Sequence, residues 1–286
     1  MKPHPPRKPD PHKPAYRKPG PPKHPRPTDW GKVAEWYDGV VGNEGSEYHR
    51  EVIFPGVLRM LRPQPGEKVL DVACGQGAFC RLLAEKGASV SGMDAAEPLV
   101  KIARERGPAT ISYGVGDARK LDFLTEGHFD AAVCILALQN IDHLLPVFAG
   151  IALALKPAGR FVMALMHPSF RGPKATSWGW DESTGVQYRR VDRYLLPRKE
   201  PIFTHPGKKT GEYTWEFHRP LQNYVRALRG AGLYVDSLEE WPSHKNSDSG
   251  PRAPAENQAR REIPMFMAIR AVKFGAVLPE VEGSQP

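Results

Sequence analysis

The chain has 286 residues, of which 40% are hydrophobic and 25% charged, and its formal net charge is +8. This composition suffices for an ordinary globular core, in one large domain or two small ones. No apolar run approaches the roughly 20 residues that a membrane helix requires, and no apolar segment follows the basic N-terminus, so neither a membrane span nor a secretory signal is expected. Cys74, Cys80 and Cys134 lack paired spacing, which argues against a disulfide framework or a zinc site and favours a reducing, cytoplasmic setting.

The positive charge is concentrated in residues 1–29. This segment carries eight lysines and arginines against two aspartates, which leaves only two of the eight net positive charges for residues 30–286. It also holds 11 of the 30 prolines and few large apolar side chains, so it cannot offset the entropy cost of ordering. We expect a disordered, partly polyproline II tail that either serves solubility alone or makes weak, nonspecific contacts with nucleic acid, an anionic membrane or an acidic partner. Residues 274–286 are expected to form a second flexible tail.

The composition changes at Trp30, where aromatic and apolar residues take up helix-like spacing. An amphipathic helix is predicted from Ser46 toward Leu61, with a kink at Pro55. Short apolar runs then alternate with helix-compatible segments of 9 to 15 residues. This alternation predicts a doubly wound α/β fold, a mostly parallel sheet with helices on both faces and its ligand site at the carboxyl ends of the strands. The predicted strands are residues 68–73, 88–93, 110–116, 129–136 and 159–166, and the predicted helices are residues 79–87, 95–107 and 142–156.

The alternation stops at His167 and resumes after His218. Residues 167–218 hold nine of the 26 aromatic side chains, and we predict that they form a cap insertion within a domain of residues 30–273. The aromatics could form the core of this cap, sandwich a planar or apolar acceptor, or do both. Afterwards the pattern predicts a helix at residues 219–232, a strand at 233–241, a loop at 242–263 and a last strand at 264–274.

The stretch VLDVACGQGAF, residues 69–79, ends a predicted strand with an acid and places Gly75 and Gly77 in the turn that follows. A kinase-type phosphate loop requires a lysine and a hydroxyl residue after its glycines, which this turn lacks. A dinucleotide site requires a third small residue, and Cys80 leaves that possibility open. Asp71 decides between the remaining ligands, since a carboxylate opposes a pyrophosphate but attracts a cation such as the ammonium group of S-adenosylmethionine.

These residues resemble the first motif of the class I S-adenosylmethionine-dependent methyltransferases, and SVSGMD, YGVGDARKL, FDAAVCILALQNIDH and LKPAGRFVMALMHPSF resemble the later motifs in that family's order. The overall pattern is most similar to the small-molecule branch that includes quinone-biosynthesis enzymes. The resemblance implies a seven-stranded sheet of order 3-2-1-4-5-7-6 with the last strand antiparallel. It also implies S-adenosylmethionine as the cofactor, with Asp71 and the glycine turn at the methionine end, Asp94 at the ribose hydroxyls and Asp117 at the adenine. The full set of implied cofactor contacts is Tyr37, Asp71, Ala73, Gly75, Gly77, Asp94, Ala95, Asp117 and Ala118.

The acceptor site is expected at the ends of the fourth and fifth strands. His167 and His143 are candidate general bases there, because an imidazole titrates near neutrality, although each could equally be a structural histidine. The fourth strand lacks the NPPY-type motif of enzymes that methylate amino groups of DNA or of protein glutamine, and no Pro-Cys pair suggests cytosine chemistry. The candidate acceptor contacts are Gln139, Asn140, Trp178, Trp180, His218 and His244.

Three functions stay open at this point. The first is methyl transfer to oxygen, nitrogen or carbon of a small molecule. The second is an RNA or protein methyltransferase tethered by the basic tail, whose affinity would depend on salt. The third is a module that binds S-adenosylmethionine without catalysis. The motifs favour the first function.

Overall fold

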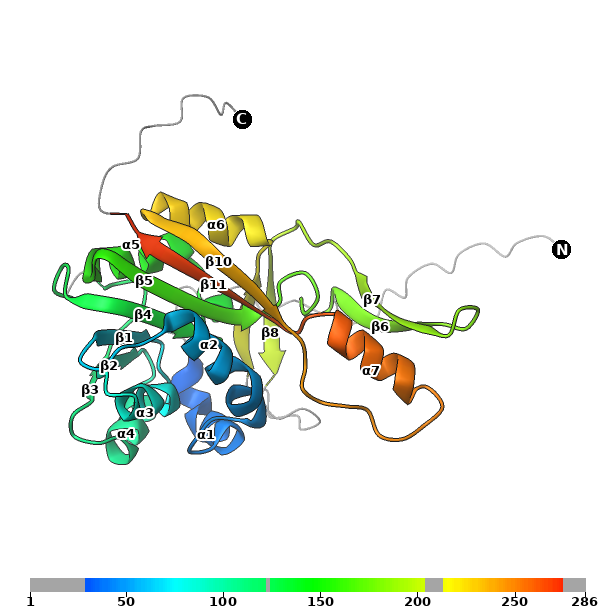
Figure 1. The fold of residues 1–286 in the computed structure, drawn as a ribbon, viewed down its shortest axis with the longest axis horizontal. Helices are drawn as coiled ribbons and strands as arrows, with labels where there is room; N and C mark the ends of the chain where they lie inside the picture. Colours follow the sequence, from blue (N-terminus) through cyan, green and yellow to red (C-terminus); the bar gives the residue numbers. More distant parts are fainter. Residues whose placement is uncertain (1–28, 122–123, 204–212, 275–286) are drawn as a thin grey trace, which may run out of the picture.

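A computed structural model describes residues 29–121, 124–203 and 213–274 (Figure 1). Apart from Asp29 and Phe274, the two predicted tails lie outside the described residues. The described part is built on one seven-stranded sheet in the order β10-β11-β5-β4-β1-β2-β3. β1 to β5 pair in parallel wherever they are neighbours, whereas β11 is antiparallel to both β5 and β10. The predicted strand order is therefore confirmed. The strands are β1 (Lys68–Val72), β2 (Ser89–Asp94), β3 (Ser112–Val115), β4 (Phe129–Ile135), β5 (Leu155–Met166), β10 (Leu233–Trp241) and β11 (Phe266–Lys273).

Helices cover both faces of this sheet, as its apolar strands require (Figure 1). Alternation along β1 buries Leu70 and Val72 against one helical layer and Val69 against the other. Asp71 has the same parity as Val69, which places an acid on a buried face. Among the described residues no helix is both long and apolar enough to cross a membrane. The first layer contains α5 (Leu144–Ala154) and α6 (Leu221–Gly230), and the second contains α2 (Phe54–Leu61), α3 (Ala78–Glu85) and α4 (Glu97–Arg106).

The N-terminal segment adds a short 3-10 helix, η1 (Asp29–Val33), and α1 (Ala34–Val41) beside α4. The helix predicted from Ser46 to Leu61 contains a π-helical turn, η2 (His49–Ile53), immediately before α2. Pro55 has no N–H to continue the regular ladder, so the irregularity falls just before it. Such π turns often occur at functional sites.

The predicted insertion consists of two antiparallel hairpins. One pairs β6 (Thr176–Asp181) with β7 (Val186–Val191), and the other pairs β8 (Arg198–Phe203) with β9 (Tyr213–His218). The first hairpin lies next to a helix, α7, that follows β10 (Figure 1).

The prediction of a loop at residues 242–263 was wrong for its second half, because α7 (Ala253–Glu262) lies there. Its terminal signals are present in the sequence: Pro254 in the first turn and two arginines in the last turn. What the segment lacks is an apolar stripe, since Ala259 is its one fully buried residue. Tertiary packing therefore decided the helix.

Candidate active site

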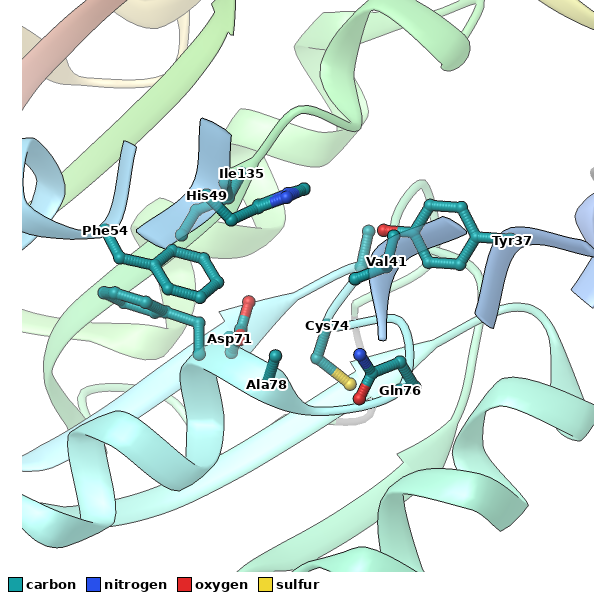
Figure 2. Close-up of a pocket in the computed structure, with 11 residues that line it drawn as sticks. Tyr37, Val41, His49, Phe54, Asp71, Cys74, Gln76, Ala78 and Ile135 are labelled. Carbon is teal, nitrogen blue, oxygen red and sulfur yellow. The ribbon is translucent and has the colours of Figure 1, made fainter. Parts of the chain in front are cut away.

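A pocket opens at the carboxyl end of β1, between α1, the π turn η2 and the start of α3 (Figure 2). It lies at the edge of the sheet where a doubly wound fold binds its ligand. Its walls combine one buried acid, a glycine-rich turn and several aromatic rings. The residues that line it are Tyr37, Val41, His49, Phe54, Asp71, Ala73, Cys74, Gln76, Ala78, Phe79 and Ile135.

Asp71 forms the floor of the pocket, and its carboxylate points into it (Figure 2). The residue is only 2% exposed, and Cys80 Sγ donates a hydrogen bond to its Oδ2 at 3.2 Å. Burial, together with the nearby charge of Asp94, raises the pKa of Asp71 to about 7 even though the Cys80 hydrogen bond lowers it. No lysine or arginine of the described residues pairs with this acid. A cationic group in the pocket would supply the missing partner.

The turn after β1 requires glycine at two positions. Gly75 and Gly77 have φ values of 57° and 78°, which side chains rarely adopt. A Cβ on Gly77 would lie 2.5 Å from Tyr113 Oη, and one on Gly75 would lie 3.4 Å from the ring of Tyr37. The backbone of the turn can therefore approach both rings and a ligand closely. Ala73 also has a positive φ of 60°, so the turn begins with a strained residue.

Asp94, at the end of β2, binds the glycine turn directly. Its Oδ2 accepts a hydrogen bond from the Gly75 N–H at 2.9 Å, and its Oδ1 accepts one from the Ala96 N–H at 2.8 Å. Burial raises the pKa of this carboxyl. Each oxygen retains a further lone pair, so the predicted contact with ribose hydroxyls remains chemically available. Ala95, another predicted contact, lies between Asp94 and Ala96 in the chain.

Asp117 follows β3 and is already paired. Its Oδ2 accepts a hydrogen bond from Arg119 Nη2 at 2.7 Å, and Arg119 Nη1 reaches Asp142 Oδ1 at 2.8 Å. The Arg119 guanidinium lowers the pKa of Asp117. The side chain predicted to contact adenine is therefore part of an ion-pair network, beside the buried Ala118.

Tyr37 extends from α1 over the glycine turn. It is half-buried, and its ring packs edge-on against Trp30 with centroids 5.4 Å apart. Burial, together with Asp94 and Asp71, raises the pKa of its phenol well above the usual value. α1 is fixed to α4 by Asp38 and Arg106, which form two hydrogen bonds of 2.6 and 2.7 Å. The aromatic N-terminal segment thus forms one wall of the pocket.

Neither of the two predicted bases lines this pocket. His167 is 4% exposed, its Nδ1 accepts the Ser169 N–H at 3.2 Å, and its Nε2 lies 2.6 Å from Glu240 Oε1. Burial lowers the pKa of His167, and both ring nitrogens are engaged. His143 lies outside the pocket with its side chain 74% exposed, 3.2 Å from Asp142 Oδ1.

The predicted acceptor contacts are spread over several elements. Gln139 donates to the Leu136 carbonyl oxygen at 2.8 Å, and its Oε1 is buried without a partner. Asn140, on the 3-10 turn η3 (Leu138–Asn140) that follows β4, donates to the Trp215 carbonyl oxygen at 2.9 Å and so joins this turn to the second hairpin. His218 Nε2 lies 2.8 Å from the Tyr194 carbonyl oxygen.

The other three predicted acceptor contacts lie near charged groups. His244 Nε2 lies 2.8 Å from Glu47 Oε1. Trp178 and Trp180 both come from β6 and contact arginine side chains, Trp180 with Arg252 at 4.5 Å. None of these three lines the pocket at the end of β1.

Among the pocket residues that the sequence analysis did not name as contacts, His49 carries an imidazole that could accept a proton. It belongs to the π turn η2, its Nδ1 lies 2.7 Å from Ser46 Oγ, and its ring packs on Phe54 at 5.2 Å (Figure 2). Burial, with a smaller effect from Arg50, lowers its pKa to about 4. Within the described part of the chain, Nε2 has no hydrogen-bond partner. The spacing of Ser46 and His49, about one helical turn, was the available signal.

These features fit S-adenosylmethionine. The buried Asp71 carboxylate lacks a cation that the ammonium group of the methionine part would supply, and the glycine turn leaves the space that a side chain would fill. Asp94 retains acceptor capacity for hydroxyl groups. The sheet order and this acid-to-glycine turn together define the class I methyltransferase fold and its donor site.

Comparison with known proteins leads to the same class. Residues 70–163 match the family model described as a methyltransferase domain. The chain is 30% identical over 246 residues to dTDP-3-amino-3,6-dideoxy-alpha-D-glucopyranose N,N-dimethyltransferase of Streptomyces fradiae, a match that covers 80% of this chain and 94% of that protein. It is 36% identical over 129 residues to nocamycin O-methyltransferase of Saccharothrix syringae, covering 43% of this chain and 45% of that protein.

A solved structure extends the comparison to the fold. The S-adenosylmethionine-dependent methyltransferase of Mesorhizobium loti matches with a TM-score of 0.62 and 31% identity, over 76% of this chain and 96% of that one. The chain belongs to the S-adenosylmethionine-dependent methyltransferase family. It is an enzyme, and its cofactor is S-adenosylmethionine.

Proposed function

We propose that this enzyme methylates a hydroxyl group or a neutral amine of a small-molecule acceptor, and that His49 receives the acceptor's proton. The observation that carries the proposal is the presence of Asp71 and His49 in one pocket. The Asp71 carboxylate is suited to a cationic group of the methyl donor, and the His49 imidazole is suited to a nucleophile that must lose a proton. The named relatives support methylation of a small acceptor at either nitrogen or oxygen. One of them is an N,N-dimethyltransferase of a dTDP-linked amino sugar, and another is an O-methyltransferase.

The donor end is held by residues of the first two strands. S-adenosylmethionine supplies a methyl group on a positively charged sulfur, which is already reactive toward nucleophiles. Asp71 would pair with the ammonium group, Asp94 would accept from hydroxyl groups, and the glycine turn would permit close backbone approach. Phe54, Phe79 and Ile135 would exclude water from the same space.

The acceptor end is organised by His49. The low pKa of His49 keeps its ring neutral at physiological pH, and only a neutral imidazole can accept a proton. If Nδ1 is the protonated nitrogen and donates a hydrogen bond to Ser46 Oγ, then Nε2 presents a lone pair toward the pocket. That lone pair would orient the O–H or N–H of the acceptor and take its proton as the new bond forms. A weakly basic imidazole suits a hydroxyl, because the hydroxyl proton becomes strongly acidic during methyl transfer.

The test compares His49→Gln with His128→Gln. His128 immediately precedes β4, at the amino end of the parallel strands and so at the opposite end from the pocket. Its ring packs on Phe129. Formation of S-adenosylhomocysteine is measured with a panel of hydroxyl and amine acceptors, and donor affinity by calorimetry. His49→Gln should lower kcat about 100-fold while donor affinity stays within about threefold, and His128→Gln should match the wild type. A kcat within twofold of the wild type on every accepted substrate would remove His49 from the mechanism.

Two earlier expectations remain predictions. One is the cytoplasmic setting, and the other is weak anion contact through residues 1–29, which lie outside the described residues except for Asp29. A salt-dependent affinity for RNA that disappears when residues 1–29 are deleted would favour the tethered RNA or protein methyltransferase instead.

A further inference from the structure

Three arginines lie close together beyond the end of β5. Arg171 lies on the segment that follows β5, Arg189 on β7 and Arg260 on α7, which packs against β7. The Nε of Arg171 is buried without a hydrogen-bond partner among the described residues. Burial, together with the positive charges of Arg189 and Arg260, lowers the pKa of Arg171 to about 10. A partly buried guanidinium with an unsatisfied N–H and like charges nearby is costly unless a ligand satisfies it.

The three guanidinium groups are held in place by neutral partners. Arg189 donates to the Phe170 carbonyl oxygen at 2.8 Å and to Thr176 Oγ1 at 2.7 Å, and Arg260 donates to Ser247 Oγ at 3.2 Å. The indole of Trp178 lies against two of them: its ring centroid is 5.4 Å from Arg171 Cζ and 5.0 Å from Arg189 Cζ. The aromatic ring therefore fixes two of the cations at one place.

None of the three arginines forms an ion pair with a carboxylate within the described residues. Three acids of nearby segments are paired with other groups: Glu240 with His167, Glu47 with His244 and Lys245, and Glu182 with Arg252. Within the described part of the chain, no carboxylate thus forms an ion pair with the arginine cluster (Arg171, Arg189 and Arg260).

This arginine cluster adjoins the donor pocket through two consecutive residues. The ring of Tyr48 packs on Phe266 of β11 with centroids 5.6 Å apart, and Phe266 pairs with Met166, the last residue of β5. Arg171 follows that strand, and His49, the residue after Tyr48, lines the pocket. Consecutive Cα atoms are about 3.8 Å apart, so one short segment lies near both places. A molecule of modest size can therefore have an anionic end at the arginines and a nucleophile near His49.

We propose that Arg171, Arg189 and Arg260 form a binding site for a phosphate or diphosphate group carried by the methyl acceptor. Guanidinium groups bind phosphate oxygens in pairs, which suits a cluster with several free N–H donors. Three positive charges match a group with two or more negative charges better than a single carboxylate. The proposal rests on the proposed function, since it assigns the acceptor of that reaction to a phosphate-bearing class.

The test uses the full chain without donor or acceptor, and inorganic pyrophosphate as the probe in about 150 mM salt, where weak surface attraction is screened. Binding is measured by calorimetry and by the shift in Tm. The variants are Arg171→Gln and Arg260→Gln, and the matched control is Arg190→Gln. Arg190 lies next to Arg189 on β7 but is exposed and paired with Asp192, so the control removes one charge from the same hairpin and leaves the basic N-terminal residues unchanged.

Pyrophosphate should raise the Tm of the wild type and of Arg190→Gln by a few degrees, because it binds the folded state alone. Its affinity should fall at least about tenfold in Arg171→Gln and Arg260→Gln. Without the probe, Arg171→Gln should unfold at the same or a higher temperature than the wild type, since like-charge repulsion is relieved; a lower temperature would mean that Arg171 is structural and would contradict the proposal. If Arg171→Gln does not fold, Arg260→Gln, with its half-exposed side chain, decides the result.

Three results would overturn the proposal. These are no Tm shift for the wild type, an equal loss of affinity in Arg190→Gln and Arg171→Gln, or acetate binding as tightly as pyrophosphate. Donor affinity is measured on the same variants and should stay within about threefold. Failure of the anion site with donor binding and methyl transfer intact would remove only this inference, whereas absence of methyl transfer to any acceptor would remove the proposed function.

Discussion

The donor pocket and the arginine cluster carry opposite charges, and neither charge is balanced by an ion pair within the described residues. The buried Asp71 at the end of β1 and the partly buried Asp94 at the end of β2 lack a cationic partner, whereas the arginines beyond the end of β5 lack a carboxylate. Burial raises the pKa of Asp71 and lowers that of Arg171, so both pKa values shift toward the neutral form for the same reason. A chain under selection for stability alone would pair these groups. Their separation indicates that ligands, and not side chains, complete the charge balance.

The largest expected effect is that of Asp71→Asn. The variant keeps the size of the side chain but removes the charge that would pair with the ammonium group, so donor affinity should fall about 100-fold. Calorimetric titration with S-adenosylmethionine measures this effect, and pyrophosphate binding should be unchanged. A loss of both affinities would show that the two regions form a single electrostatic site and would break the comparison.

Asp71 should also impose a pH dependence. Its folded pKa of about 7 lies above its unfolded value, so between about pH 4 and pH 7 the folded state keeps a proton that the unfolded state has lost. Stability therefore falls as pH rises through this window and is constant above it. Asp71→Asn has no carboxyl at this position and does not lose stability in this way. The Tm of the variant minus that of the wild type should therefore increase from pH 4 to pH 7. Donor affinity of the wild type should rise from pH 5.5 to 7.5, whereas that of the variant should stay flat.

A smaller effect, on both affinity and stability, is expected for Asp94→Ala. The substitution leaves the N–H groups of Gly75 and Ala96 without their acceptor, which should lower the free energy of unfolding by about 2 kcal/mol. Donor affinity should fall about tenfold or more, because the glycine turn loses its anchor as well as a contact. Chemical denaturation and calorimetry give the two values. The control is Asp130→Ala. Asp130 lies near the amino end of β4, at the opposite end of the strands from the pocket, and its carboxylate accepts hydrogen bonds from Lys156 Nζ and the Lys68 N–H. This variant should lose stability but keep its donor affinity.

The smallest effect is expected for Arg106→Ala. Arg106 and Asp38 join α4 to α1, which carries Tyr37 over the pocket, but the pair is partly exposed. The free energy of unfolding should fall by about 0.5 to 1 kcal/mol, and donor affinity should fall about twofold. Lys101→Ala is the control, since its ion pair with Glu105 stays within α4. An equal loss of donor affinity in both variants would show that the pair does not position Tyr37.

The sequence predicted the α/β sheet because its elements depend on local signals. Apolar runs, helical spacing and turn glycines are read over a few residues, and the resemblance to a known family supplied the strand order. Asp71, Gly75 and Gly77 lie within one stretch of seven residues, so a single motif contains much of the predicted donor site. Asp71 and the glycine turn indeed line or border the pocket.

Partners distant in sequence account for the failures. His167 looked available at the end of its strand, but Glu240, 73 residues later, occupies its Nε2. The hairpins and α7 lack the clean apolar periodicity on which sequence reasoning depends, so their existence was decided by packing against each other.

The amino-acid sequence by itself therefore determined the fold class and the acid-to-glycine turn, because short-range sterics and hydrophobic spacing are sufficient for them, whereas the strand order followed from the resemblance to a known family. Only the tertiary structure decided which side chains meet. It brought His49 to the pocket of Asp71, and it gathered Arg171 and Arg189 around Trp178, with Arg260 on the adjoining helix α7. Contacts of this kind depend on the packing of distant segments, and no local pattern of residues specifies that packing.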